Sequence, residues 1–194
     1  MGEGFVICEY EKVRQEFPEF QTTMNTLKNS LISKASTEWG IPAERFTLES
    51  GNLTTVLPAC FNDNAGTRMT TWEQWFTATG SQTIMTGAGT GGIIPEDFMV
   101  GVCGLAFLDK AIRISEIKMQ ISEAKLARVN IEEAFVYNKP AVVFEKGYIL
   151  DQKTGFELVA FVLSQGPQRI KLIGVQANKV KDKLFTTATG AAVV

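Results

Sequence analysis

The stretch that decides the fold is IRISEIKMQIS, residues 112–122, in which apolar and polar side chains alternate. A period of two places the apolar side chains on one face and the polar ones on the other, which is typical of a half-buried β-strand. The alternation slips by one residue at Ser115-Glu116. Because a single extra residue in a strand forms a β-bulge, residues 112–122 predict a strand with a bulge.

The same kind of pattern continues toward the C-terminus. Residues 127–132 also alternate, and residues 141–150, 156–163 and 169–180 are largely apolar segments separated by turn-forming residues. We interpret these three segments as two successive β-hairpins. Residues 156–163 are apolar at almost every position, so they should form a central strand that is covered on both faces.

Short strands at this spacing predict a mainly β fold. They recur about every 10–15 residues with short turns between them. This spacing favours an antiparallel β-sandwich, jelly-roll-like in style, over a parallel α/β sheet, which needs a long crossover between successive strands. We assign the sandwich to residues 46–194 and a helical N-terminal segment, with one amphipathic helix, to residues 1–45.

A helix is predicted directly after Pro18. Apolar side chains recur there at steps of three and four residues, as the period of an α-helix requires, and the positions between them are polar. Pro18 suits a first helical turn, whereas Gly40 and Pro42 end the helix. The apolar stripe is expected to pack either on the domain's own core or on a neighbouring subunit; its members are Phe20, Met24, Leu27, Leu31, Ala35 and Trp39.

Three stretches have weaker patterns. Residues 46–60 predict one or two short strands, interrupted at Ser50-Gly51-Asn52. Thr70-Thr71-Trp72-Glu73 has the form of a helix capping box and favours a short helix through Phe76, with a threonine-rich strand as the alternative. Residues 98–112 fit either a helix or a buried strand, and we favour the strand.

The chain of 194 residues contains no histidine. This excludes Ser-His-Asp and Cys-His nucleophilic catalysis, histidine-ligated zinc or iron, and imidazole as a general base. Carboxylate-based hydrolysis remains open, because two carboxyls facing one substrate are sufficient for it. However, adjacent acids such as Glu96-Asp97 and Glu132-Glu133 point to opposite faces of a strand. We therefore expect a protein without catalytic residues.

Two short motifs are weak candidates for ligand binding. Residues 87–92 match the G-x-G-x-x-G pattern of dinucleotide-binding loops, but Ile93-Ile94-Pro95 follows where a long helix is required. Asn62-Asp63-Asn64 offers oxygen ligands for calcium without the spacing of an EF-hand. We predict no cofactor and no metal. The three cysteines lack metal-like spacing and are expected to be buried, reduced thiols; they are Cys8, Cys60 and Cys103.

The net charge of −2 is unevenly distributed. Residues 1–110 hold 7 basic and 13 acidic side chains, a net charge of −6, and residues 111–194 hold 12 basic and 8 acidic ones, a net charge of +4. Such polarity can favour head-to-tail contacts between copies. No basic cluster is dense enough for a strong nucleic-acid footprint, and no apolar run is long enough for a transmembrane segment. The first residues lack a secretory signal, so we expect synthesis in a cytoplasm.

Together these features predict a self-assembling structural subunit, such as a viral coat protein, a shell protein or a filament protein. Its partners would be other copies of itself and other assembly proteins, and it would be incorporated into a virion or another assembly. The alternatives are a carbohydrate- or protein-binding β-sandwich module that uses two tryptophans, and a carboxylate-dependent hydrolase. We expect assembly contacts at the helix stripe, the two tryptophans and the uncharged C-terminal tail, namely Phe20, Met24, Leu27, Leu31, Trp39, Trp72, Trp75, Val193 and Val194.

Overall fold

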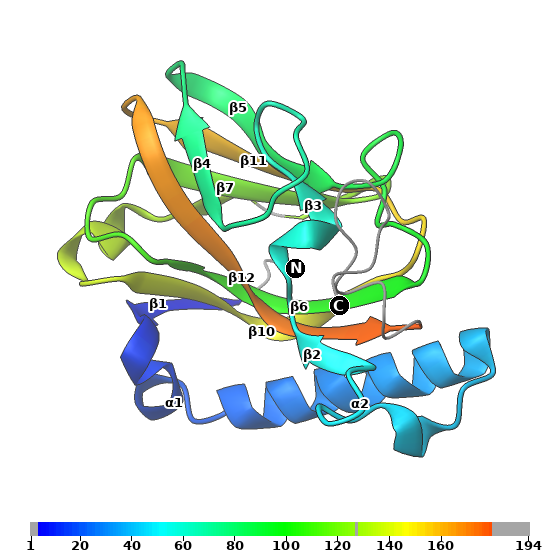
Figure 1. Ribbon diagram of the computed structural model, residues 1–194. Helices are drawn as coiled ribbons and strands as arrows, with labels where there is room; N and C mark the ends of the chain where they lie inside the picture. Colours follow the sequence, from blue (N-terminus) through cyan, green and yellow to red (C-terminus); the bar gives the residue numbers. More distant parts are fainter. Residues whose placement is uncertain (1–3, 127, 180–194) are drawn as a thin grey trace.

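The computed structural model describes residues 4–126 and 128–179, which form two antiparallel β-sheets and one long helix (Figure 1). The first sheet has the strand order β1-β10-β6-β12-β2, and β4 also pairs with β12. The second has the order β3-β5-β11-β7-β8, and β9 also pairs with β7. The strands of the first sheet are β1 (Phe5–Glu9), β2 (Leu53–Thr55), β4 (Glu73–Phe76), β6 (Phe98–Phe107), β10 (Pro140–Leu150) and β12 (Gly166–Asn178). Those of the second are β3 (Phe61–Asn62), β5 (Gly80–Gly87), β7 (Ile114–Ile121), β8 (Ala124–Lys125), β9 (Val129–Asn130) and β11 (Phe156–Val162).

The helices are short apart from α2. The two α-helices are α1 (Val13–Glu16) and α2 (Phe20–Trp39), and the 3-10 helices are η1 (Tyr10–Lys12), η2 (Ala43–Arg45), η3 (Pro58–Cys60) and η4 (Glu132–Val136). Among the described residues, no helix has both the length and the hydrophobicity that a transmembrane span requires.

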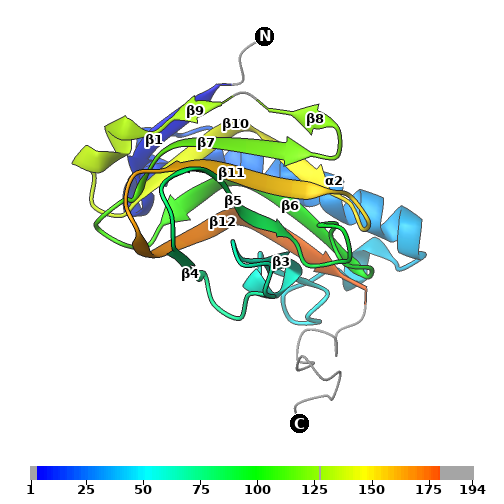
Figure 2. The ribbon, with the colours of Figure 1, turned by 90° about the horizontal axis from the view of Figure 1, so that it is seen from above.

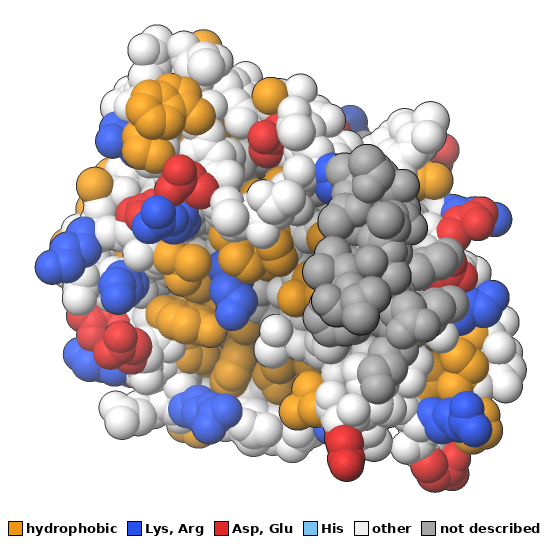
Figure 3. Space-filling model, in the orientation of Figure 1, with side chains coloured by type: hydrophobic (Ala, Val, Ile, Leu, Met, Phe, Trp, Pro, Cys, Tyr) orange, Lys and Arg blue, Asp and Glu red, His pale blue; other side chains and the backbone are white. Residues whose placement is uncertain are grey.

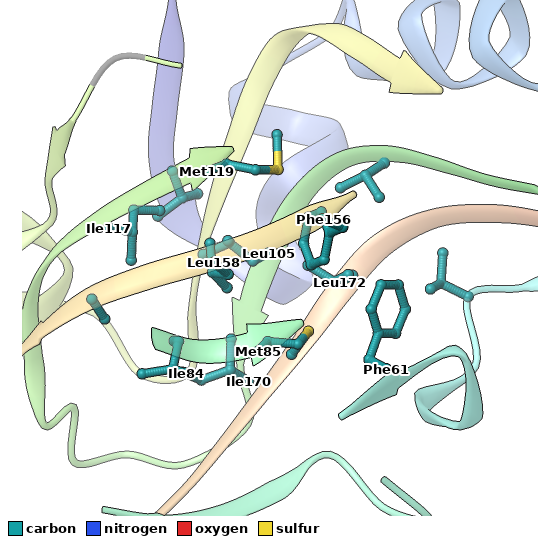
Figure 4. Packing of buried hydrophobic residues seen from close by; sticks show 14 of the residues in the cluster. Phe61, Ile84, Met85, Leu105, Ile117, Met119, Phe156, Leu158, Ile170 and Leu172 are labelled. Carbon is teal, nitrogen blue, oxygen red and sulfur yellow. The ribbon is translucent and has the colours of Figure 1, made fainter. Parts of the chain in front are cut away.

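The hydrophobic core lies between the two sheets (Figure 4). Leu105 and Leu172 point into it from the first sheet, and Met119 and Leu158 point into it from the second. β6 is buried at every position because one of its faces packs on this core and the other lies under α2. The strand favoured for residues 98–112 is therefore confirmed over Phe98–Phe107.

The long helix α2 crosses the outer face of the first sheet, on the side away from the core (Figures 1 and 2). It begins two residues after Pro18 and ends at Gly40, whose φ of +64° lies in the left-handed region that glycine adopts readily. Its apolar stripe packs on the protein's own sheet, which was one of the two predicted alternatives. The buried members of the stripe are Phe20, Leu27, Leu31 and Ala35.

The N-terminal segment supplies a strand as well as the helix. β1 pairs antiparallel with β10, with Ile7 opposite Val142, and forms an edge of the first sheet. The helical segment assigned to residues 1–45 is thus joined to the sheets by main-chain hydrogen bonds. Of the strands predicted in residues 46–60, only Leu53–Thr55 forms, and it lies after the break expected at Ser50-Gly51-Asn52.

The two predicted hairpins are wrong, although their strands are present. β10 and β11 lie in different sheets, and so do β11 and β12. The connections at residues 151–155 and 163–165 therefore carry the chain from one sheet to the other. A turn signal indicates that the chain reverses direction, but the partner of each strand depends on packing that a period of two does not encode.

The predicted bulge is present in β7. Phe161 lies opposite Glu116 and Val162 lies opposite Ile114, so that Ser115 is the extra residue. β11 is a central strand between β5 and β7, as predicted, but no helix or strand of the described residues covers its outer face. Phe161 on that face is 42% exposed, because α2 packs on the other sheet.

Glu73–Phe76 form a strand, preceded by a bend at residues 70–72, where a helix was predicted. β4 pairs with β12, and its side chains are exposed and buried in alternation, with Gln74 and Phe76 inside. The strand alternative ends at Phe76, and β5 begins at Gly80. Burial of the Phe76 ring in the core outweighs the local capping signal, since tertiary packing routinely overrides local propensity.

Candidate functional site

One end of the molecule gathers four connections between strands, at the left in Figure 1. They join β4 to β5 (77–79), β6 to β7 (108–113), β9 to β10 (131–139) and β11 to β12 (163–165). The register brings them together, since Phe76 at the end of β4 pairs with Gly166, and Val162 at the end of β11 pairs with Gly80. We call this surface the loop end.

The loop end carries most of the large exposed apolar side chains in the described residues. Water contact with apolar groups is unfavourable, so exposed apolar surface of this kind often marks an interaction site. Figure 3 shows hydrophobic side chains gathered at the upper left, over β4 and the start of β12. The members and their exposed fractions are Trp75 (60%), Phe135 (46%), Val136 (79%), Phe161 (42%) and Leu163 (46%).

Arg113 fixes two of the connections to each other. Its Nε donates to the carbonyl of Pro167 at 3.0 Å, and its Nη1 donates to the carbonyl of Gln165 at 2.7 Å and to Ser164 Oγ at 3.1 Å. A guanidinium holds three such acceptors well because its donors have a fixed planar geometry. The exposed apolar side chains near the β11–β12 connection therefore stand on a fixed main chain.

A second set of polar contacts holds β4 against β12 at the same end. Arg169 pairs with Glu73 at 2.7 Å, and the Asp109 carboxylate accepts the main-chain N–H of Arg169 at 2.5 Å. Trp75 lies directly opposite Pro167 in this ladder. The most exposed aromatic ring in the described residues is thus carried by a paired strand and not by a free loop.

Most of the predicted assembly contacts do not lie at the surface. The members of the helix stripe are buried or half-buried against the protein's own sheet, and Trp72 is half-buried against the core. Phe20, Leu27 and Leu31 are buried against the sheet and are not exposed to a second copy in this fold. The contacts expected at the half-buried Met24, Trp39 and Trp72 stay predictions. Trp75 is the one predicted contact among the described residues that is exposed, whereas Val193 and Val194 lie outside the described residues.

Four exposed residues of the loop end were missed by the sequence patterns. Residues 127–132 alternate like a strand, but within the described residues 128–132 only Val129–Asn130 forms one, and η4 then carries Phe135 and Val136 outward. Phe161 and Leu163 were expected under a second covering layer. A sequence signal for the exposed Phe135 and Val136 was present in residues 132–136. There two large apolar residues follow two acids, and the alternation of a strand is lost.

The glycine-rich segment 87–92 forms a tight turn. Gly91 and Gly92 have φ angles of +80° and +75°, and a Cβ on Gly87 would meet the main chain of Ile93 at 2.3 Å. No helix follows, because the chain continues through Pro95 into β6. The turn thus lacks the helix N-terminus on which pyrophosphate binding depends.

The oxygen atoms of the Asn62-Asp63-Asn64 loop are used to shape the loop. Asp63 Oδ1 accepts the main-chain N–H groups of Ala65 and Thr67, both at 2.9 Å, and the Asn64 amide donates to the carbonyl of Trp75 at 2.9 Å. Among the described residues there is no group of three or more Cys, Asp or Glu side chains placed to hold a metal ion.

The described hollows do not bring acids together. Three of them, of about 450, 300 and 250 Å³, are each lined by a single carboxylate, respectively Glu145, Glu11 and Glu157. A glycosidase-like reaction requires two carboxyls across one substrate. The three cysteines are buried, and burial raises the pKa of Cys60 and of Cys103 to about 12, which keeps both thiols protonated near neutral pH.

Comparison with protein-family models gives no match, and comparisons with curated proteins and with solved structures give no significant match either. The surface of this chain is therefore the basis for inferring its function.

Proposed function

We propose that the protein is a self-assembling structural subunit, of the kind found in coats, shells or filaments, and that copies meet through the loop end. The observation that carries this proposal is the set of exposed apolar side chains there, led by Trp75 and Val136. Large aromatic side chains on a fixed main chain lose little conformational freedom on binding and are common at the centres of protein interfaces.

We propose further that the two sheets form a jelly-roll sandwich with one amphipathic helix on its outside. The strand order supports this, because four strands of each sheet follow the orders β2-β12-β6-β10 and β5-β11-β7-β8. Along the chain, β5, β6 and β7 alternate between the sheets, and so do β10, β11 and β12. Two interlocked Greek keys of this type recur in viral coat proteins and in lectins. The fold alone does not decide between these uses.

The proposal is tested by measuring the size of the protein in solution. Sedimentation velocity over a range of concentrations, with negative-stain imaging, should reveal assemblies that form by contact between copies. Because Trp75 and Val136 are exposed, W75S/V136S should leave the fold intact and raise the concentration needed for assembly by about tenfold or more.

A matched control uses an exposed leucine away from the loop end. Leu48 is 74% exposed and follows η2, so L48S removes a similar apolar side chain without touching the proposed contact. Its assembly should equal that of the unsubstituted protein. A monomer of 21.3 kDa that persists at high concentration would overturn the proposal.

A second candidate function is binding of carbohydrate by Trp75. An exposed indole on a paired strand is a suitable platform for stacking on a sugar ring. Trp72 does not share this surface, since it is half-buried against the core. If W75S abolished binding to a glycan array while the unsubstituted protein stayed monomeric, the binding module would replace the structural subunit.

A further inference from the structure

The outer edge of β12 has a gap between two strand partners. β4 pairs with Gly166–Arg169, and β2 pairs with Val175–Ala177 on the same edge. Over residues 170–174 no described strand pairs with β12 on this side. The chain leaves the edge after Thr55 and returns at Trp72, so that β2 and β4 are two pieces of one interrupted edge strand.

The main-chain groups of Leu172 and Gly174 face this gap. Leu108 donates its N–H to the carbonyl of Arg169 on the β6 side, whereas Ile170 donates its N–H to the carbonyl of Trp72 on the gap side. The direction of main-chain hydrogen bonding alternates from residue to residue in a strand. Ile170 and Leu172 therefore point to the gap. The register with β6 shifts between Ile173 and Gly174, but Asn178 donates its N–H to Asn52 on the β2 side, so alternation counted back from Asn178 points Gly174 to the gap as well.

Leu172 and Gly174 have no partner there among the described residues. Both residues are buried. Buried main-chain donors and acceptors are almost always paired, because leaving one unpaired away from water costs free energy comparable to a lost hydrogen bond. The gap is thus a short piece of sheet edge that can still accept and donate main-chain hydrogen bonds.

A hollow of about 300 Å³ opens at the same place, with a lining that is partly apolar and also includes the charged residues Glu11, Arg14 and Lys171. Its floor is β12, including Leu172 and Gly174, and its wall comes from η1, α1 and the start of α2, including Phe20 and Met24. Figure 3 shows it as a depression lined by hydrophobic side chains, between β4 and α2. A segment that fits must be extended, to pair with β12, and small or apolar side chains suit the part of the hollow beside Phe20 and Met24.

We propose that an extended part of the C-terminal tail, centred on residues 184–189 of a second copy, enters this gap as a strand antiparallel to β12. The inference deepens the proposed function, on which it rests, by naming one contact between copies. Residues 184–194 are Leu-Phe-Thr-Thr-Ala-Thr-Gly-Ala-Ala-Val-Val, an uncharged and mostly small set. Addition of a strand to an open sheet edge is a common mode of protein recognition.

The position at which the tail leaves the fold favours a second copy as its source. Lys179 follows β12 on the far side of β2, which occupies the edge next to the gap. A tail that returned to its own gap would have to pass around β2 before pairing. The tail of a neighbour makes no such detour, and residues 180–194 can span up to about 50 Å when extended.

Hydrogen exchange of single main-chain amides tests this pairing in the chain of 194 residues. Lys171 and Ile173 bond to β6, so their N–H groups should exchange slowly at every concentration. Leu172 and Gly174 should exchange quickly in dilute protein and about tenfold or more slowly at concentrations where copies associate. Mass spectrometry with fragmentation to single residues can follow all four amides.

A tail variant identifies the segment that provides the protection. Adjacent N–H groups in a strand point to opposite sides, so either Thr186 or Thr187 donates toward β12. T186P/T187P removes both N–H groups and therefore removes that donor in either register. It should abolish the slow exchange of Leu172 and Gly174, whereas T186S/T187S keeps both donors and should behave like the unsubstituted protein. A synthetic peptide of residues 184–194, added in excess, should protect the two amides in the dilute protein.

The outcomes separate this inference from the proposed function. If copies assemble while Leu172 and Gly174 exchange quickly at all concentrations, the tail contact is wrong and the structural subunit stands. If the two amides are slow at all concentrations, the tail pairs within its own chain and the contact between copies is wrong. If the protein remains a monomer throughout, the proposed function fails and the contact fails with it.

Discussion

At the scale of single residues, the contact between α2 and the first sheet depends on Leu27 and two glycines. A Cβ on Gly147 would lie 2.7 Å from Leu27 Cδ1, and a Cβ on Gly101 would lie 3.0 Å from Leu27 Cγ. Both glycines are in strands whose outer face α2 covers. Their missing side chains allow the helix to approach the sheet closely.

We predict that G147A destabilises the protein by about 1–3 kcal/mol, because the added methyl group overpacks the contact with Leu27. Urea unfolding followed by circular dichroism measures the change. G155A is a suitable control, since a Cβ there would meet only ordinary contacts at 3.7 Å or more. If G147A and G155A lose equal stability, the cause is the replacement of a glycine as such, and crowding at Leu27 is not the cause.

The buried thiols predict a dependence of stability on alkaline pH. Burial raises the pKa of Cys103 to about 12, whereas in the unfolded chain the thiol has its ordinary pKa near 9. The folded state therefore binds the proton more tightly. Its stability is fully present below pH 9 and falls as the pH rises toward 12, by up to about 1.4 kcal/mol per pH unit for each such thiol.

C103A should reduce this loss. Between about pH 9 and pH 11, its free energy of unfolding should fall less steeply than that of the unsubstituted protein, although its stability at pH 8 is lower because a cavity forms. Urea titrations at several pH values measure the slopes. Parallel curves for the two proteins would contradict the prediction.

At the scale of elements, α2 is fixed by packing more than by its ends. Leu31 is fully buried and lies in a cluster with Ala35, Leu53 and Met99, where helix, β2 and β6 meet. The N-cap residue Glu19 makes no capping hydrogen bond through its side chain. Most of the helix's stability must therefore come from its contact with the sheet.

We predict that L31A lowers the free energy of unfolding by about 2–5 kcal/mol, as expected when a buried leucine is truncated and leaves a cavity. L48A, at an exposed position, should change it by less than about 0.5 kcal/mol. Thermal and urea unfolding of the two variants check this difference. Equal effects would mean that α2 does not stabilise the fold through this cluster.

The elements also show what sequence patterns can and cannot predict. A period of two was sufficient to locate β7 and its bulge at Ser115, and the spacing of apolar residues located α2. The partners of β10 and β11 were not predictable, because antiparallel strands of either sheet have the same alternation. The exposed site was less predictable still: Trp75 was identified as an aromatic residue, but whether it faced inward depended on whether β4 was a strand or a helix.

At the scale of the whole molecule, the acidic and the basic half of the sequence are interleaved in space. The acidic half contributes β6, and the basic half contributes β10 and β12, which pair with β6 on its two sides. On the face drawn in Figure 3, acidic and basic side chains lie next to each other and do not separate into two regions. Head-to-tail attraction between oppositely charged ends is therefore not supported as the force that joins copies.

We predict accordingly that assembly resists salt. Contacts made by Trp75, Val136 and their neighbours are apolar, and salt does not screen apolar contacts as it screens charge pairs. Raising sodium chloride from about 0.05 to 1 M should leave the assembled fraction unchanged or increase it. Sedimentation velocity at the two salt concentrations gives the answer. Dissociation at high salt would indicate that ion pairs hold the copies together.

The place of β12 has a consequence for how the chain is made. This strand follows every other described strand in the sequence, yet it lies inside the first sheet, between β6 and the edge formed by β2 and β4. A ribosome-bound chain that has not yet released residues 166–178 therefore has an open slot beside β6. Folding of that sheet must wait for late synthesis, and until then the unfilled slot is a natural binding site for chaperones or a starting point for aggregation.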